Sequence, residues 1–375
     1  MLQLGAGLYL PMAWSAKPDQ LLGALSPRRG TDKIWNHTRE TMNEFHSSDD
    51  EQQISLYGRD LLSVTDLTRD EIESVFELAL AFKEGRIRPA TQRQIAAGQT
   101  LALIFDKASL RTRVSFETAI RNLGGHPIYL APADIRLGER EPVKDAARTL
   151  SRMVDGIAAR LSSDEMMAEL AQWADVPVIN AMTNLEHPCQ AMADLLTVRE
   201  YKQTFSGLRF AYIGDGFNVC QSLMLLCAIL GIDFALASPK GYEPNLAIVQ
   251  KAQELATGSV IELSNDPTVA LQDADVVCTD VWVSGGLEAE AAQRRKDFAG
   301  FQLNANTMKL AKPDAIVLHC LPAHRDEEIT DEVIEGPQSV VFDEAENRLW
   351  AQQAILAMIL GSPSGEAESK SKRGR

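Results

Sequence analysis

Short apolar runs alternate with amphipathic stretches along most of this chain, and this alternation limits its fold more than any other feature. Apolar runs bounded by turn residues predict buried strands, and apolar residues at helical spacing predict helices that cover them. The expected strands are 101–105, 127–130, 156–160, 177–180, 210–213, 233–237, 274–279, 315–319 and 339–342, and the expected helices include 113–122, 144–154 and 218–230. This order predicts an α/β fold with mostly parallel sheets flanked by helices.

A length of 375 residues fits about two domains. We expect one lobe over 54–186, a second over 187–346, interdomain helices that join them, and a final helix at 347–361 that packs on the first lobe. Residues 1–53 and 362–375 show no sustained period and are predicted to be a disordered extension and a disordered tail. Met42 directly precedes the run into the folded part, so translation from Met42 is a further hypothesis.

The charge balance limits the partners. The chain has 37 Lys and Arg against 52 Asp and Glu, a net charge of −15, which argues against non-specific binding to nucleic acid or an anionic membrane. Any anionic ligand must therefore be bound by a local cluster. The chain contains an odd number of cysteines without a C-x-x-C pair, which favours a reduced, cytoplasmic compartment and no structural zinc; they are Cys189, Cys220, Cys227, Cys278 and Cys320.

Polar residues follow most of the predicted strands. Ligands of open α/β sheets bind beyond the carboxyl ends of the strands, so these residues are the candidates for a site. After the strand 101–105, Ser109 is expected to begin a helix, where free N–H groups and hydroxyls favour a phosphate. Arg111 and Arg113 in the first turn oppose the helix dipole at a cost of about 0.3–1 kcal/mol each, which favours a bound anion over a plain capped helix.

Two other chemistries are weaker alternatives. Gly214 and Gly216 resemble part of a dinucleotide-binding turn, but Val219 stands where its third glycine belongs. His187 lies near Cys189, and His319 adjoins Cys320, so a thiol nucleophile has to be considered. Side chains at such short spacing generally point apart, and free cysteines are more often buried than reactive.

Three motifs give the chain a specific resemblance to the aspartate/ornithine carbamoyltransferase family, from about Gly58 to Leu360. The family's Ser-Thr-Arg-Thr corresponds to Ser109-Leu110-Arg111-Thr112, its His-Pro-Cys-Gln to His187-Pro188-Cys189-Gln190, and its His-Cys-Leu-Pro to His319-Cys320-Leu321-Pro322. Aspartate enzymes carry His-Pro-Thr-Gln and His-Pro-Leu-Pro at the last two places. The two cysteines therefore favour the ornithine members.

The resemblance implies a carbamoyl phosphate site in the lobe 54–186. It assigns carbamoyl phosphate to Ser109, the backbone of Leu110, Arg111, Thr112, Arg160, His187, Gln190, Cys320, Leu321 and Arg348. Arg160 would bridge phosphate and carbonyl oxygen, His187 would donate to that oxygen, and Gln190 would hold the carbamoyl NH₂. Attack of an amine on this activated carbonyl requires neither a metal nor an organic cofactor.

The resemblance also implies an ornithine site in the lobe 187–346. Asn218, Asp280, Ser284 and Gly285 would bind the α-amino and α-carboxylate end, and Cys320 with Asp280 would position the δ-amine. Because a free amine titrates near about 10.4, only a small fraction is nucleophilic at neutral pH. We therefore expect the rate to rise with pH.

The sequence departs from the family pattern at four positions. Leu110 replaces a threonine of the phosphate loop, Gly285 replaces a methionine that lines the amino-acid pocket, and Phe217 replaces an asparagine. Arg136 stands where the family has a glutamine that reaches the phosphate from a neighbouring subunit. This correspondence implies at least a homotrimer with its active sites between protomers.

The function that the resemblance favours is synthesis of citrulline from ornithine and carbamoyl phosphate. Gly285 and Phe217 leave open another acceptor, such as putrescine or an acylated ornithine. A non-catalytic regulator of the same fold is a further alternative. It would be expected to have lost polar residues of the reaction centre, which this chain retains.

Overall fold

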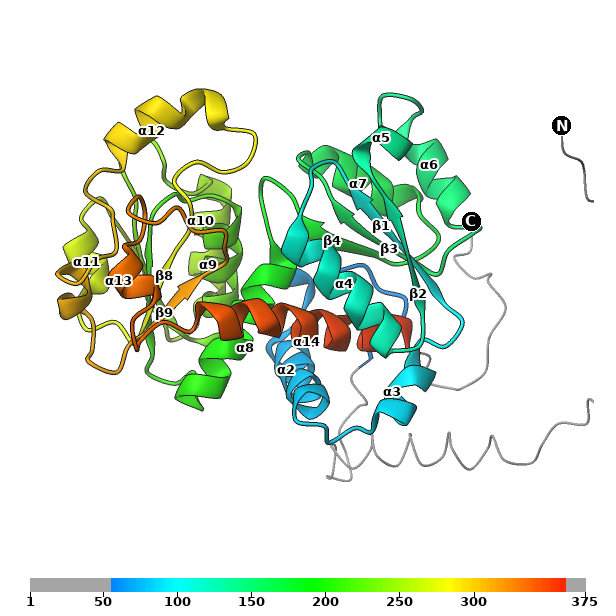
Figure 1. Ribbon diagram of the computed structural model, residues 1–375, viewed down its shortest axis with the longest axis horizontal. Coiled ribbons are helices and arrows are strands. Elements are labelled where there is room, and N and C mark those ends of the chain that lie inside the picture. The colour runs from blue at the N-terminus through cyan, green and yellow to red at the C-terminus, as the bar shows by residue number, and fades with distance from the viewer. Residues whose placement is uncertain (1–54, 362–375) are drawn as a thin grey trace, which may run out of the picture. The chain divides into compact units, whose positions relative to one another are not determined.

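The computed structural model describes residues 55–361 (Figure 1). The expected extension 1–53, with Met42, and the expected tail 362–375 lie outside the described residues. The predicted fold class is confirmed, because the described residues form two sheets with parallel strands throughout and helices between the strands. No helix in this part of the chain is long and apolar enough to cross a membrane.

The first sheet has the strand order β2-β1-β3-β4. Its strands are β1 (Thr100–Phe105), β2 (His126–Leu130), β3 (Gly156–Arg160) and β4 (Val178–Met182). The short apolar run of β1 is buried on both faces, as expected for a central parallel strand. The other elements of this part are η2 (Val64–Asp66), α2 (Arg69–Lys83), α3 (Pro89–Ile95), α4 (Leu110–Asn122), α5 (Pro132–Ile135), α6 (Val143–Leu150) and α7 (Asp164–Trp173).

The second sheet has the order β7-β6-β5-β8-β9. Its strands are β5 (Arg209–Ile213), β6 (Asp233–Ala237), β7 (Ile261–Ser264), β8 (Val276–Thr279) and β9 (Ile316–His319). β7 was not predicted, because it is an edge strand whose residues are only partly buried and whose apolar pattern is weak. The helical elements here are α9 (Asn218–Leu230), α10 (Leu246–Leu255), α11 (Pro267–Leu271), η3 (Glu288–Glu290), α12 (Ala291–Asp297), η4 (Thr307–Leu310) and α13 (Asp331–Ile334).

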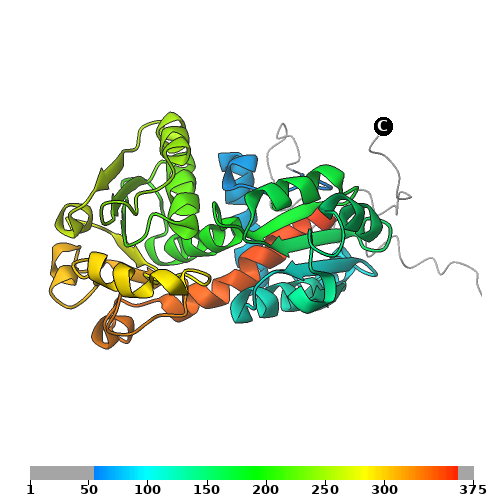
Figure 2. The same cartoon turned by 90° about the horizontal axis from the view of Figure 1, so that it is seen from above.

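Two long helices connect the sheets. α8 (Pro188–Lys202) runs between β4 and β5, and α14 (Val341–Leu360) follows β9. α14 packs against α8, α4 and α2 and also contacts β9, so it extends from the second sheet along the first (Figures 1 and 2). Both helices are buried along most of their length although they carry many polar residues. Those buried polar groups must find partners inside the protein or in a ligand.

The prediction of a strand at 339–342 is wrong. Ser339 forms one isolated bridge with Val317, and the chain then enters α14 at Val341, earlier than the expected Asn347. A short apolar run such as Ser339 to Phe342 has no periodicity that separates a buried strand from the start of a buried helix. The packing of α14 on α8 and α4, which the local sequence does not encode, decides between them.

The strand orders explain where the polar loops meet. In the first sheet the chain leaves β1 toward β2 on one side and leaves the adjacent β3 toward β4 on the other, and in the second it leaves β5 toward β6 and the adjacent β8 toward β9. At such a switch point the two outgoing loops separate and leave a crevice beyond the carboxyl ends of the strands. The N-terminus of α4 and Arg160 lie at the first switch point, and the N-terminus of α9 and Asp280 lie at the second.

Candidate active site

The loop after β1 presents a free helix N-terminus. Ser109 is the N-cap of α4, in extended conformation, and its side chain makes no capping hydrogen bond. The first N–H groups of a helix have no partner within it, so they and the Ser109 hydroxyl remain available to an anion. The Leu110 side chain is 73% exposed. Replacing threonine by leucine there therefore leaves the backbone N–H in place.

Arg113, which the sequence analysis counted as an unpaired cation, has partners within the protein. Arg113 Nε donates to Glu117 Oε1 at 2.7 Å, and the guanidinium lies 3.6 Å from the centre of the Tyr129 ring. Its charge is balanced by these two neighbours and not by a ligand. The expectation of an anion at the start of α4 therefore depends on Arg111, which is half-buried and lies close enough to His187 to lower its pKa.

Two arginines converge on Thr112, in the first turn of α4. Arg348 Nη2 donates to Thr112 Oγ1 at 2.9 Å, and Arg160 Nη1 lies 3.5 Å from the same oxygen. Arg348 also donates through Nη1 to Gln190 Oε1. Thr112, Gln190 and Arg348 are each at most 3% exposed. The structure thus brings together four predicted site residues from β3, α4, α8 and α14.

Neither arginine of this cluster hydrogen-bonds a carboxylate in the described structure. The Nε atoms of Arg160 and Arg348 are buried without a hydrogen-bond partner in the described structure. Burial, followed by the proximity of Arg348, lowers the pKa of Arg160 to about 10, so the group stays protonated at neutral pH. Burial likewise lowers the pKa of Arg348. Two buried cations that hydrogen-bond neutral groups favour a small anion between them.

His187 lies at the start of α8 and is buried. Its backbone N–H donates to Ser222 Oγ at 2.9 Å, and Ser222 in turn donates to Glu186 Oε2 at 3.0 Å, which fixes the turn into α8. Burial, with Arg348, Arg160 and Arg111 nearby, lowers the pKa of His187 well below its usual value. The imidazole is therefore neutral at pH 7. It can donate one hydrogen bond, but it is a poor store for a proton.

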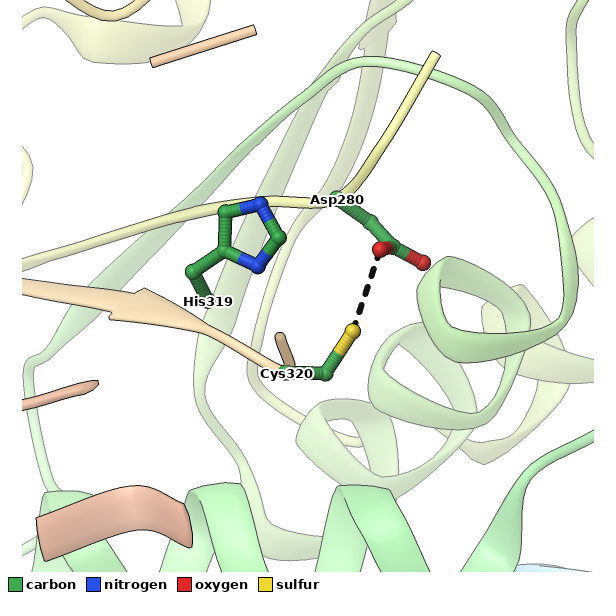
Figure 3. A group of neighbouring side chains, drawn as sticks. All are labelled: Asp280, His319 and Cys320. Carbon is green, nitrogen blue, oxygen red and sulfur yellow. Dashed lines mark hydrogen bonds between the residues drawn. The ribbon is translucent and has the colours of Figure 1, made fainter. Parts of the chain in front are cut away.

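Cys320 and Asp280 meet beyond the ends of β9 and β8. The Cys320 thiol donates to Asp280 Oδ1 at 3.1 Å, and the Val281 N–H donates to the same oxygen at 2.7 Å (Figure 3). Burial and the adjacent carboxylate raise the pKa of Cys320 well above its usual value. Burial raises the pKa of Cys189 to about 12. A nucleophilic cysteine needs an accessible thiolate, so neither residue fits the alternative of a thiol nucleophile.

Asp280, His319 and Cys320 also form a group of metal-ligand types, with one donor atom of each within 4.8 Å of the others (Figure 3). Both ring nitrogens of His319 are already engaged. Nδ1 accepts the Leu321 N–H at 2.9 Å, and Nε2 lies 3.0 Å from Glu328 Oε1. A metal would have to break one of these bonds. The geometry favours His319 as a support for the Cys320–Leu321 turn.

The remaining predicted acceptor residues follow β5 and β8. Asn218, the first residue of α9, is buried, with Nδ2 donating to Thr183 O at 2.6 Å. Ser284 and Gly285 lie in the loop after β8, where Gly285 is exposed. Lys107 Nζ, from the loop after β1, donates to Gly285 O at 3.0 Å. This contact, which the sequence did not predict, joins the loop of the first sheet to that of the second.

Gly216, in the turn after β5, is required by close packing. A Cβ on Gly216 would lie 2.4 Å from Pro244 N, so only glycine fits there. Asp215 is buried and forms an ion pair with Arg294 at 2.5 Å. The turn therefore owes its glycine to packing against Pro244, in the same part of the protein, and not to a bound dinucleotide.

Some residues fall outside this assembly, and others were missed. Arg136 is exposed at the end of α5 and contributes no hydrogen bond to the site within residues 55–361. Sequence reasoning missed Asp194 and Glu344, which contact Gln190 from inside the protein. Each stands four residues from a predicted site residue on the same helix, and that spacing was the available signal.

Comparison with known proteins identifies the family. Residues 59–200 match the carbamoyl-P binding domain of aspartate/ornithine carbamoyltransferase, and residues 206–359 match its Asp/Orn binding domain. The chain is 52% identical over 309 residues to ornithine carbamoyltransferase of Carboxydothermus hydrogenoformans, covering 82% of this chain and 99% of that protein. It is 49% identical over 302 residues to the Methanosarcina mazei ornithine carbamoyltransferase, covering 80% of this chain and 99% of that protein.

Solved structures agree. The ornithine carbamoyltransferase of Pyrococcus furiosus superimposes with a TM-score of 0.79 at 49% identity, covering 82% of this chain and 98% of that chain. The anabolic ornithine carbamoyltransferase of Campylobacter jejuni superimposes with a TM-score of 0.76 at 39% identity, covering 80% and 97%. With both family domains matched and close relatives along nearly their whole length, this chain belongs to the aspartate/ornithine carbamoyltransferase family.

Proposed function

We propose that this chain transfers the carbamoyl group of carbamoyl phosphate to the δ-amine of L-ornithine and releases L-citrulline and phosphate. The observation that carries the proposal is the buried pair Arg160 and Arg348 on Thr112, at a helix N-terminus that lacks its own cap. Such a site suits a small dianion. The names of the relatives support carbamoyl phosphate as the donor and ornithine as the acceptor.

The donor is held by the groups after β1 and β3. Ser109, Arg111, Thr112 and the Leu110 N–H bind the phosphate, and Arg160 and Arg348 offset its negative charge. His187, neutral because its pKa is lowered, donates to the carbonyl oxygen, where charge develops in the transition state. Gln190 and the backbone at Cys320 and Leu321 hold the carbamoyl group.

The acceptor is held by the groups after β5, β8 and β9. Asn218, Ser284 and the backbone of Gly285 bind the α-amino and α-carboxylate groups, and Asp280 with Cys320 positions the δ-amine. The neutral amine attacks the carbonyl carbon, a C–N bond forms, and the C–O bond to phosphate breaks with its electrons on phosphate. The departing phosphate accepts the amine's proton, because His187 and the arginines are poor acceptors.

A different acceptor has one specific observation in its favour. Phe217 directly precedes Asn218, one of the residues that hold the α-amino and α-carboxylate groups. Gly285, in place of the family's methionine, has no atom within 4 Å of the position of a Cβ. Both departures enlarge or reshape the acceptor side, which suits a longer amine such as an acylated ornithine.

We further infer a homotrimer in which Arg136 reaches the phosphate of a neighbouring protomer. The exposed apolar side chains Leu110 and Val114, one helical turn apart on α4, offer a contact surface beside the phosphate loop. Sedimentation of the active protein tests this inference, and a fully active monomer would contradict it. The free cysteines fit a cytoplasmic location.

The test of the function is product analysis with ¹³C-labelled carbamoyl phosphate and ornithine. We expect labelled citrulline and phosphate in a one-to-one ratio, and loss of both with Arg160→Met. We also expect kcat/KM for ornithine to rise from pH 6 to pH 9, since the fraction of neutral amine rises over that range. Absence of citrulline, or a flat pH profile, contradicts the proposal.

A further inference from the structure

Two carboxylic acids lie directly behind Gln190, on the side away from Arg348. Gln190 Nε2 donates to Asp194 Oδ1 at 2.7 Å and lies 3.4 Å from Glu344 Oε1. Asp194 and Glu344, called the acid pair below, are completely buried. Asp194 lies one turn after Gln190 on α8, and Glu344 lies one turn before Arg348 on α14. The two helices therefore face each other through two matched pairs of polar residues.

The contacts of Gln190 allow only one orientation of its amide. The side-chain hydrogen bond between Asp194 and Glu344 engages the proton of the acid pair, so Asp194 Oδ1 accepts from the amide NH₂. A guanidinium can only donate, so the amide oxygen must face Arg348. If the amide were flipped, its NH₂ would face the guanidinium, and this contact would be repulsive because both groups can only donate. The acid pair and Arg348 together fix an orientation that a free glutamine would not keep.

Glu344 makes a second contact that reaches the other half of the site. Its Oε2 accepts the His319 N–H at 2.7 Å, at the end of β9 and next to Cys320. One buried side chain on α14 thus contacts both Gln190 on α8 and the backbone that precedes Cys320. A shift of Glu344 would therefore move two groups at once. One is Gln190, which holds the donor, and the other is the backbone before Cys320, which positions the acceptor.

The protonation of the acid pair fits this role. Burial raises the pKa of Asp194 to about 7, and burial with the proximity of Asp194 raises the pKa of Glu344 well above its usual value. Arg348 and Asp280 face the same pair and act in opposite directions. At neutral pH the pair keeps at least one proton, so it does not neutralise both arginines of the phosphate site.

We propose that Asp194 and Glu344 are positioning residues for carbamoyl transfer, which hold the Gln190 amide with its oxygen toward Arg348 and the carbamoyl NH₂. This inference rests on the proposed function, since it assigns Gln190 to the carbamoyl group. The acid pair itself touches neither substrate. It acts through Gln190 and, from Glu344, through the His319 backbone.

A double-mutant cycle between Asp194 and Gln190 tests the proposal. We expect Asp194→Leu to lower kcat by about 30-fold, because the amide loses its main acceptor, and Asp194→Asn to stay within about 5-fold, because its amide oxygen still accepts. In a Gln190→Ala background, Asp194→Leu should lower kcat by less than about a further 3-fold. If the loss of kcat in the double variant equals the product of the losses in the two single variants, the proposal is overturned, since a general structural defect acts whether or not Gln190 is present.

An exchange of donor and acceptor keeps the proposal testable if Asp194→Leu does not fold. Gln190→Glu places three carboxyl groups together and should lower kcat by about 30-fold or more. Adding Asp194→Asn supplies a donor to the new carboxylate and should restore at least about 5-fold of that loss. No recovery in the double variant would contradict the assigned orientation.

Thr197→Val is the matched control. Thr197 is buried on α8 and accepts from Asn347 of α14 at 2.9 Å, in the same interface but away from Gln190. We expect a lower melting temperature with kcat within about 2-fold of the parent, since the hydroxyl's hydrogen bond is lost without moving Gln190. An equal loss of kcat in Thr197→Val and Asp194→Leu would reduce the acid pair to a structural role and overturn the proposal.

Failure of the proposed function is distinguishable from failure of this inference. If the parent protein turns over no acceptor, the function is wrong. The same double-mutant cycle is then measured as binding affinity for phosphonoacetamide. This stable analogue of carbamoyl phosphate keeps the amide and has a methylene in place of the bridging oxygen. Calorimetry should show weaker binding with Asp194→Leu and no further loss in the Gln190→Ala background. Full multiplication of the losses again overturns the inference.

Discussion

The two halves of the site differ in how firmly the protein holds them. The donor half consists of Thr112, Arg160, Gln190 and Arg348, whose side chains are linked by hydrogen bonds. Three of these residues are almost fully buried. The acceptor loop, residues 281–287, is partly exposed and glycine-containing, and Lys107 contacts it through one hydrogen bond to Gly285 O. The donor half is assembled within the described chain, whereas the acceptor loop is buried only at Trp282, whose carbonyl oxygen accepts from Arg294, and is exposed at Gly285 and Gly286.

This difference explains where the chain tolerates departures from its family. Leu110, in the donor half, changes a side chain that points to solvent and leaves the backbone N–H that the phosphate needs. Gly285 and Phe217 both fall on the acceptor side, where a changed side chain alters the room left for the substrate. Donor identity is therefore constrained by the buried network, and acceptor identity depends on a few loop residues.

Breaking the donor half should have the largest effect. Arg348→Met removes the guanidinium that bridges Thr112 and Gln190, and it leaves Gln190 Oε1 buried without its donor. We expect kcat/KM for carbamoyl phosphate to fall by about 10²–10³-fold, the usual effect of losing one preorganised donor to developing charge. Steady-state kinetics at saturating ornithine measures it. A loss below about 10-fold would mean that the network is not where the donor binds.

Removing the thiol from the acceptor side should have a smaller and more selective effect. Cys320→Ala deletes the donor to Asp280 and should lower kcat/KM for ornithine by about 10–100-fold, as for a hydrogen bond to a charged group. The KM for carbamoyl phosphate should change little. Cys320→Ser, which keeps a donor, serves as the control. An equal rise in both KM values would show that the two halves are not separable.

The buried acid behind the donor half should make stability depend on pH. The pKa of Asp194 is about 7 in the folded protein against about 3.9 in an unfolded chain. The folded state therefore binds more protons at Asp194, so the contribution of this group to stability is fully present below about pH 4 and is lost as the pH rises from there through about 7. Between pH 5 and pH 8 the melting temperature should fall by about 2–4 °C more in the parent than in Asp194→Asn. Identical slopes would show that Asp194 does not titrate there.

Restoring the family's methionine should produce the smallest gain. Open space surrounds the Cβ position of Gly285, so Gly285→Met fits without a clash and adds apolar contact with the substrate. If ornithine is the acceptor, its KM should fall by about 2–10-fold, corresponding to one or two buried methylenes. A higher KM for ornithine would indicate that the glycine suits a different amine.

Leu110→Thr is the control for this comparison, since it restores the family residue in the donor half. We expect the KM for carbamoyl phosphate to stay within about 2-fold of the parent, because the backbone N–H that binds the phosphate is present in both proteins. A larger improvement would show that the missing hydroxyl matters to the phosphate.

The sequence predicted the framework of the site because strand ends are local features. Arg160 at the end of β3 and Cys320 after β9 follow apolar runs that are plain in the sequence. Arg113 was misjudged because its i,i+4 partner Glu117 was not weighed and because Tyr129, its other partner, lies on β2. The acid pair could not be predicted, because its contacts exist only when α8 and α14 pack together. Position along one helix gives a residue's face but not what lies opposite.

The central claim is that the donor half binds carbamoyl phosphate and that the acceptor side selects ornithine. The most direct measurement is kcat/KM for ornithine, putrescine, N-acetylornithine and aspartate, with carbamoyl phosphate saturating. We expect kcat/KM for ornithine to exceed that for each of the others by about 100-fold or more, since the groups that bind its α-amino and α-carboxylate ends would be left without a partner by putrescine. Preference for another amine would contradict the acceptor assignment, and no turnover with any of them would contradict the account as a whole.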